Sequence, residues 1–256
     1  MRRHSSWVMV TTISIVLVAC GSAEEVATTS STTPPTTAVL DPATTTTTPA
    51  TTTTTAAPTT TVSSGLPGDP IDFGPVAGDI LAAIGVAHDD VLNLRLAPGA
   101  DQAIVAEIPP LYSELVAMGA TRQLAASMWI QVDYLGLIGW VNLRFIAYLG
   151  ATNDVTAQIV SNLGETPVAE SMLALGLIVA ESILTEAPDA TLVMSAAPTV
   201  GDLGEVTYDI VGSGDDSVSG SRIHVFGQPV DGGFSLQAVE ASPFCSRGLG
   251  LNDECV

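Results

Sequence analysis

The amino-acid sequence predicts a multidomain protein in which a small all-β barrel is followed by an α+β domain, with two helices on a four-stranded antiparallel sheet. Three observations predict this architecture. Residues 1–70 are an apolar leader followed by a run of Thr, Ala and Pro. Residues 71–150 contain short apolar stretches separated by Gly and Pro turns, a pattern typical of small barrels. Residues 151–256 begin with helical periodicity and continue with alternating strands.

The first residues of the chain have the order of a secretory signal peptide. Arg2 and Arg3 precede an apolar run over residues 7–18, and small residues follow. This run is shorter than the ~20 residues that a helix needs to cross a bilayer. We therefore expect residues 1–19 to be removed and Cys20 to become the first residue of the mature chain.

The sequence Leu-Val-Ala-Cys that ends at Cys20 resembles the lipobox of bacterial lipoproteins. The resemblance implies that Cys20 is diacylated, with palmitate as a typical chain, and that the protein is anchored to the membrane through this lipid. It also implies a location on the extracytoplasmic face of the bacterial cell membrane.

Residues 20–70 form a linker whose composition disfavours folding. The segment from Thr28 to Ser64 is mostly Thr, Ala and Pro, with unbroken threonine runs at 44–48 and 51–55. Such a segment buries too little apolar surface to offset the entropy of ordering, so we predict that it is disordered. Its expected role is to hold the folded domains away from the membrane.

The chain is strongly acidic. It has 27 acidic residues against 7 basic ones, a formal net charge of −20, and every basic residue is an arginine. Arg2 and Arg3 leave with the signal peptide, so the mature chain is more acidic still. A charge of this sign opposes binding to polyanions, and we expect no nucleic-acid partner.

Two cysteines, Cys245 and Cys255, remain after Cys20 is assigned to the lipid. In an oxidising extracytoplasmic space such a pair usually forms a disulfide. A metal site would need further ligands, and no histidine or third cysteine lies beside them in the sequence. We predict a disulfide bond between Cys245 and Cys255.

Two motifs resemble the conserved ends of bacterial SH3-like domains. The sequence LNLRLAPG at 92–99 is similar to the opening motif of that family, and WIQV at 129–132 with GWV at 139–141 is similar to the closing motif. The resemblance covers about residues 77–150 and implies a small β-barrel that acts as a binding module. Many such domains occur in exported bacterial proteins, and some bind peptidoglycan or its peptides.

The resemblance also implies a ligand site in a groove between loops, lined by aromatic and polar side chains. The two tryptophans of the closing motif are instead expected in the core, since large aromatics fill small barrels. Arg95 has the alternative role of a structural cation that pairs with an acid. The candidate ligand-binding residues are Tyr112, Tyr134, Tyr148 and Arg95.

Two helices are expected at the start of the last domain. Asn153 or Asp154 is placed to cap the first helix, which Gly164 would end. Thr166-Pro167 is a start signal for the second helix. Apolar residues then recur at steps of three and four, which predicts a buried face made of Val168, Met172, Leu175, Val179 and Ile183.

Four strands are expected after these helices, near residues 191–194, 205–210, 222–226 and 234–239. The end of the chain, Cys-Ser-Arg-Gly from Cys245 and then Cys-Val, resembles the tail of exported actinobacterial lipoproteins whose activity is not assigned. This second resemblance implies that the protein is exported, but it implies no activity.

The sequence contains no recognisable catalytic motif. Asp215-Asp216 lies in an ordinary Gly-Asp-Asp-Ser turn, and neither His88 nor His224 lies in a nucleophile or metal motif. We therefore expect a protein that is not an enzyme and that has no cofactor and no metal site. The leading hypothesis is a surface lipoprotein whose SH3-like domain binds peptidoglycan or an exported protein.

Two alternatives remain open. In the first, residues 151–256 bind a small ligand or an exported protein, and the barrel is a spacer. In the second, the protein is an extracytoplasmic hydrolase whose acidic catalytic residues follow no known motif. Exposed aromatics on the barrel would favour the leading hypothesis, and an apolar pocket in the C-terminal sheet would favour the first alternative.

Overall fold

Antiparallel strands are the main secondary structure of the described chain. The structure, a computed structural model, describes residues 65–256. Among these residues the helices are α1 (Thr156–Leu163), α2 (Met172–Leu184) and the 3-10 turns η1 (Leu143–Phe145) and η2 (Leu251–Asp253). The strands are β1 (Asp69–Pro70), β2 (Ile80–Ala83), β3 (Leu92–Arg95), β4 (Ile104–Ile108), β5 (Leu115–Leu124), β6 (Ser127–Tyr134), β7 (Leu137–Asn142), β8 (Ile146–Leu149), β9 (Asn153–Asp154), β10 (Val168–Ala169), β11 (Thr191–Val200), β12 (Gly204–Val211), β13 (Val218–Val230) and β14 (Gly233–Cys245).

The predicted signal peptide, Cys20 and nearly all of the predicted linker lie outside the described residues. The end of the linker is described. Asp69 and Pro70 form β1, which pairs with Gln123 and Arg122 of β5. The described part of the chain lies in one compact unit.

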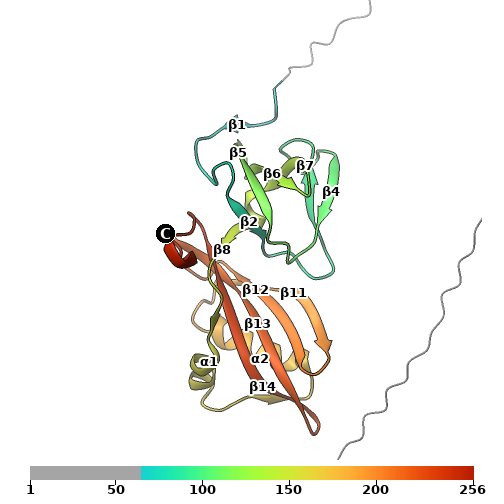
Figure 1. The fold of residues 1–256 in the computed structure, drawn as a ribbon, viewed down its shortest axis with the longest axis vertical. Helices are drawn as coiled ribbons and strands as arrows, with labels where there is room; N and C mark the ends of the chain where they lie inside the picture. Colours follow the sequence, from blue (N-terminus) through green and yellow to red (C-terminus); the bar gives the residue numbers. More distant parts are fainter. Residues whose placement is uncertain (1–64) are drawn as a thin grey trace, which may run out of the picture. The chain divides into compact units, whose positions relative to one another are not determined.

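The strands form one continuous sheet rather than two. Neighbouring strands follow the order β11-β12-β13-β14-β8-β2-β5-β6-β7-β3-β4, and the whole sheet has 14 strands (Figure 1). The N-terminal and C-terminal strands of the sheet are joined at β8. There Phe244 pairs with Leu149 and Cys245 with Tyr148, while Ala82 of β2 pairs with Ala147 on the other side.

This continuity overturns the predicted fold class. A separate SH3-like barrel and a separate α+β domain with its own four-stranded sheet are wrong, because pairing runs without a break from β11 to β4. At the predicted boundary, Gly150, the backbone is instead still hydrogen-bonded to the sheet. The N–H of Gly150 donates to the Pro243 oxygen at 2.9 Å. Side-chain patterns identify extended segments, but pairing between distant strands is made by the backbone and leaves no such pattern.

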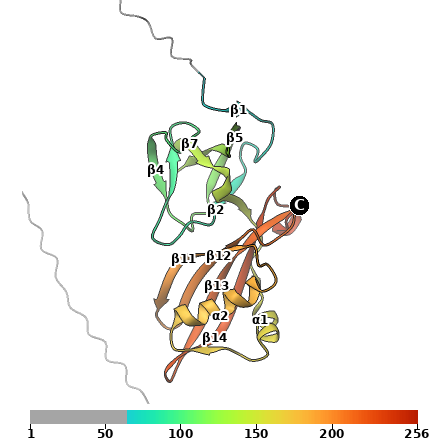
Figure 2. The same ribbon diagram turned by 180° about the vertical axis from the view of Figure 1, so that it is seen from behind.

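Both helices cover the same face of strands β11–β14, as seen from behind in Figure 2. Helix α2 begins at Ser171, whose hydroxyl accepts from the N–H of Ala174 at 3.2 Å. Leu175 and Val179 are fully buried against the sheet. The expected start at Thr166-Pro167 is wrong, because Val168 belongs to β10 and is exposed. The expected end of the first helix is right, since Gly164 is in the left-handed conformation there.

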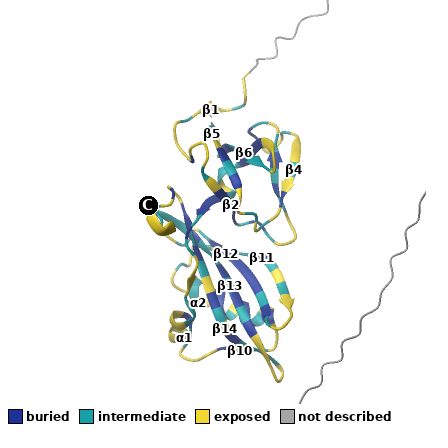
Figure 3. Ribbon diagram, in the orientation of Figure 1, coloured by how far each residue is buried: buried dark blue, intermediate teal, exposed yellow. Residues whose placement is uncertain are grey.

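The N-terminal strands enclose a second core. Figure 3 shows buried stretches along β2, β5 and β6 and an exposed β4. The side chains of Leu81, Leu94, Ile108, Leu115, Ile130 and Val132 are fully buried there. Trp129 and Trp140 are also buried, as expected for large aromatics in a small core.

A buried ion pair lies where the N-terminal strands meet the C-terminal sheet. Arg222 on β13 donates to both carboxylate oxygens of Asp209 on β12, at 2.8 and 3.0 Å. The same guanidinium donates to the backbone oxygen of Ala83 at 2.8 Å. The second oxygen of Asp209 accepts from the N–H of Gly85, also at 2.8 Å. Side chains of β12 and β13 in the C-terminal part of the sheet therefore bind the backbone at Ala83 and Gly85 in the N-terminal part.

The predicted disulfide between Cys245 and Cys255 is confirmed, with Cα atoms 5.0 Å apart. Cys245 is fully buried. The tail between them folds back, and the oxygen of Asp253 accepts from the N–H of Ala151 at 3.0 Å. In the described part of the chain, no helix is long and apolar enough to cross a membrane.

Candidate functional site

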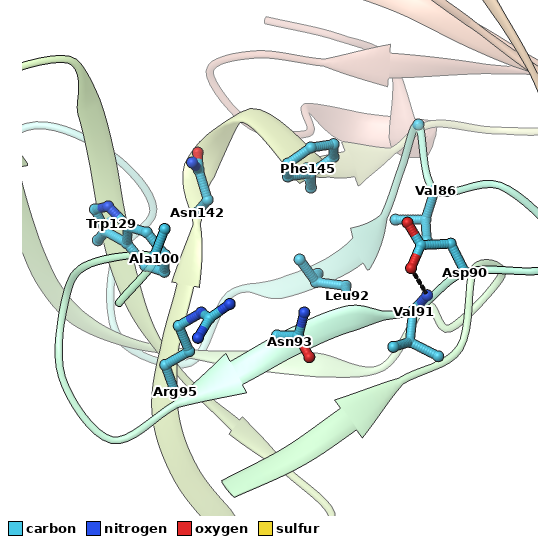
Figure 4. Close-up of a pocket in the computed structure, with 11 residues that line it drawn as sticks. Val86, Asp90, Val91, Leu92, Asn93, Arg95, Ala100, Trp129, Asn142 and Phe145 are labelled. Atoms are coloured by element: carbon cyan, nitrogen blue, oxygen red, sulfur yellow. Dashed lines mark hydrogen bonds between the residues drawn. The ribbon is translucent and has the colours of Figure 1, made fainter. Parts of the chain in front are cut away.

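A pocket of about 250 Å³ opens beside β3 in the N-terminal part of the sheet. One wall is β3 itself, and the facing wall is the end of β7 with η1 (Figure 4). The connection between β2 and β3 closes one end. The residues that line the pocket are Gly85, Val86, Asp90, Val91, Leu92, Asn93, Arg95, Ala100, Trp129, Asn142 and Phe145.

The polar groups of the pocket come from both walls. Asn93 and Arg95 lie two residues apart on β3, so their side chains point to the same face. Arg95 donates through Nη1 to the backbone oxygen of Gln102 at 2.6 Å, which fixes its direction. Asn142 accepts from the N–H of Arg144 at 3.0 Å through its side-chain oxygen, which leaves its amide nitrogen as a donor.

The two ends of the pocket differ in charge. Trp129 and Ala100 lie near Arg95, whereas Asp90 lies at the other end, beyond Asn93 (Figure 4). One carboxylate oxygen of Asp90 accepts from the N–H of Val91 at 2.8 Å. The pocket thus has a guanidinium at one end, a carboxylate at the other and amides between them. This arrangement suits a ligand that carries a carboxylate, amide groups and an ammonium group.

Of the four candidate ligand residues, Arg95 lines this pocket and the three tyrosines do not. Tyr112 and Tyr134 form an edge-to-face pair with ring centroids 4.8 Å apart, and both pack against the core. Desolvation, with a smaller contribution from Glu114, raises the pKa of Tyr112. The structure therefore gives this pair a packing role.

Tyr148 is the most buried of the three tyrosines. Its hydroxyl donates to Oδ2 of Asp79 at 2.5 Å, and so it joins β8 to the residue that precedes β2. Burial first, and then the hydrogen bond to Asp79, raise the pKa of Tyr148 well above the usual value. Tyr148 is 8% exposed, and it lines a separate pocket of about 260 Å³ together with residues such as Phe73 and Arg144.

Sequence reasoning missed four residues of the site: Asp90, Asn93, Asn142 and Phe145. For Asn93 a signal existed, because residues two apart in a strand share a face and Arg95 had been chosen. For Asn142 and Phe145 no local signal existed, because they reach the pocket through the pairing of β7 with β3, where Trp140 lies opposite Arg95. Asp90 lies in the connection that leads from β2 into β3.

A second polar cluster lies on the face of β11–β14 that the helices leave open. His224 and Phe226 alternate with the buried Ile223 and Val225, so they point away from the helices. Their rings lie 4.1 Å apart. Nε2 of His224 is 3.3 Å from a carboxylate oxygen of Glu205. This group is partly exposed, and Glu205 also lines a shallow surface pocket with residues 199–203.

The acidic turn at Asp215-Asp216 has a structural explanation. Asp215 accepts from the N–H groups of Val218 and Ser217, and these hydrogen bonds lower its pKa. Asp216 pairs with Arg247 on the surface. Within residues 65–256, no three His, Cys, Asp or Glu side chains come together as metal ligands.

Comparison of the chain with protein-family models, with curated proteins and with solved structures finds no match to any of them.

Proposed function

We propose that this protein is a non-enzymatic surface lipoprotein that binds a peptide-bearing component of the cell envelope, peptidoglycan, in the pocket beside β3. The observation that carries this proposal is the half-buried guanidinium of Arg95 in a pocket that also presents the amides of Asn93 and Asn142. The peptides of peptidoglycan carry free carboxylates, amides and amino groups, which match these partners and Asp90.

The charge of the chain makes the position of Arg95 informative. Among the described arginines, Arg222 and Arg247 pair with carboxylates, Arg144 lies over the Phe145 ring, and Arg95 and Arg122 donate only to backbone oxygens. Of the arginines without a carboxylate partner, Arg95 is the one that lines the pocket beside β3. In a chain with 27 acidic residues, a guanidinium beside a pocket and without a carboxylate partner in the described residues is available for a ligand anion. The surrounding negative charge would repel polyanions and so restrict the ligand to small or zwitterionic groups.

We expect Arg95→Gln to weaken binding to purified soluble peptidoglycan fragments about tenfold to a hundredfold. This range corresponds to the loss of a hydrogen bond to a charged group, roughly 1.5–3 kcal/mol. The measurement is isothermal titration of the non-acylated mature chain, residues 21–256. Arg95→Lys should retain part of the affinity, because lysine keeps the positive charge but cannot form the bidentate hydrogen bonds of a guanidinium.

Arg122→Gln is the matched control for this experiment. Arg122 also donates to backbone oxygens, that of Gly68 at 2.9 Å and that of Leu66 at 3.4 Å, but it lies outside the pocket. It should leave the affinity unchanged. Equal losses in the two variants would show a general charge effect, and no binding by the unaltered chain would remove the peptidoglycan proposal.

The open face of the C-terminal sheet supports a second candidate function, in which residues 151–256 bind the ligand. The stacked His224 and Phe226 beside Glu205 favour it. If Phe226→Ala abolishes binding of the peptidoglycan fragments and Arg95→Gln leaves that binding intact, the second site is favoured over the pocket.

We propose that lipid on Cys20 holds the protein at the extracytoplasmic face of the membrane. The support is the order of basic, apolar and small residues before Cys20 in the sequence. We expect Cys20→Ala to release the protein from membrane fractions into the soluble fraction, and mass spectrometry to find acyl chains on the unaltered chain alone. Equal membrane association of both forms, without an acyl mass, would contradict the proposal.

A further inference from the structure

Strand β4 (Ile104–Ile108) is the last strand of the sheet on the N-terminal side. Among the described residues it pairs only with β3, through pairs such as Asn93 with Glu107 and Leu94 with Ala106. Its other edge faces solvent (Figures 1 and 3). Alternate residues of an antiparallel strand point their N–H and C=O groups away from the paired neighbour, so this edge carries a row of free donors and acceptors.

The opposite edge of the same sheet is protected. Strand β11 contains Pro198, and its pairing with β12 shifts register twice, which bends the edge. In addition, the N–H of His88 donates to the oxygen of Met194 on this strand at 2.9 Å. Strand β4 has no proline, its pairing with β3 shifts register once, between Leu94 and Arg95, and its one charged side chain is that of Glu107.

The side chains around the β4 edge are apolar and exposed. Ile104 is 50% exposed, Val105 is 39% exposed and the neighbouring Leu96 is 66% exposed. A free strand edge together with exposed apolar side chains fits an added strand, in which backbone hydrogen bonds give affinity and alternate side chains give specificity.

We infer that the β4 edge binds an extended polypeptide segment of another protein, which adds to the sheet as a further strand and carries a basic side chain near Glu107. A second copy of this chain fits poorly, because each copy has a net charge of −20 and the two would repel. The binding surface is separate from the pocket beside β3, and the inference does not depend on the peptidoglycan proposal.

The test uses the non-acylated mature chain and a synthetic seven-residue peptide that alternates lysine and valine. Amide hydrogen exchange should become slower at residues 104–108 when the peptide binds, because the free N–H groups gain acceptors. A peptide N-methylated at alternate residues should bind at least tenfold more weakly, since it cannot donate to the edge. The Arg95→Gln variant should bind the unmodified peptide as the unaltered chain does.

Glu107→Gln should weaken binding of the lysine peptide about twofold to fivefold, the effect of one exposed ion pair. Glu114→Gln is the matched control, because Glu114 is exposed and lies between β4 and β5, off the edge. Unchanged exchange at residues 104–108, or equal binding of the N-methylated peptide, would overturn the inference. Protection of β4 in concentrated protein without peptide, with sedimentation as a dimer, would also overturn it and identify a second copy as the occupant.

Discussion

Asp209→Ala is expected to lower the free energy of unfolding by about 3–5 kcal/mol, the cost of leaving one partner of a buried ion pair alone. Asp209 is fully buried, and the side chain of Arg222 is 11% exposed. Without the carboxylate, the guanidinium would keep only backbone oxygens as partners, that of Ala83 and, at 3.5 Å, that of Pro110. The N–H of Gly85 would lose its acceptor as well.

Urea unfolding followed by circular dichroism measures this loss. The control is Asp216→Ala, which breaks the exposed pair between Asp216 and Arg247. That change should cost less than about 1 kcal/mol, because exposed ion pairs contribute little. The double variant Asp209→Leu with Arg222→Met should recover much of the stability, since no charge is then left unpaired. Similar losses for Asp209→Ala and Asp216→Ala would contradict the structural role assigned to the buried pair.

The same ion pair supports the candidate site. The N–H of Gly85 donates to the Asp209 carboxylate, and Gly85 lines the pocket together with Val86 and Asp90. Losing the carboxylate should therefore loosen the connection between β2 and β3 before the whole chain unfolds. Arg222 also lies over the Phe244 ring, 5.8 Å from its centroid, which places the pair where the N-terminal strands meet the C-terminal strands of the sheet.

Local periodicity located the four strands expected after the helices correctly. The alternation in residues 205–210 corresponds to β12, and the apolar stretch at 222–226 lies inside β13. These segments follow the period of two because one face meets the helices and the other does not. Strand β5 does not alternate throughout. Gly119 has a positive φ of 77°, and the register with β6 shifts between Ala117 and Thr121, so the alternation is interrupted there.

What the sequence could not reveal is how the strands are joined. The pairs between Ala82 and Ala147 and between Phe244 and Leu149 link segments far apart in the chain. They are formed by backbone groups, which every residue carries. Helix α2 illustrates the same limit. Thr166-Pro167 and Ser171 both carry start signals, and pairing of Val168 with Ser235 decides in favour of Ser171.

The candidate site was predictable only in its most local part. Arg95 was selected from its motif, and it lies in the pocket. Tyr148 was selected as an aromatic residue, but its hydroxyl is taken by Asp79. Neither Asn142 nor Asp90 could be chosen, because their positions depend on the pairing of β3 with β7 and on the turn held by Asp209.

Removal of the disulfide is expected to lower the free energy of unfolding by about 2.5–3 kcal/mol, the chain-entropy value for a loop of this length. The two cysteines are 10 residues apart in the sequence. The variant of choice is Cys255→Ala, because Cys255 is the more exposed of the two and Cys245 is part of the core. This change should free the tail without opening a cavity beneath β14.

Loss of the disulfide should loosen the C-terminal tail more than it destabilises the whole fold. The oxygen of Asp253 accepts from the N–H of Ala151, and the N–H of Gly250 donates to the Glu254 oxygen at 2.7 Å. In Cys255→Ala, amide exchange at Ala151 should become faster, whereas exchange in α2 should change only as far as global stability does. Alkylation of the unfolded, unreduced mature chain should label neither Cys245 nor Cys255. Two labelled thiols, or a melting temperature that reduction does not lower, would show that the disulfide does not stabilise the native protein.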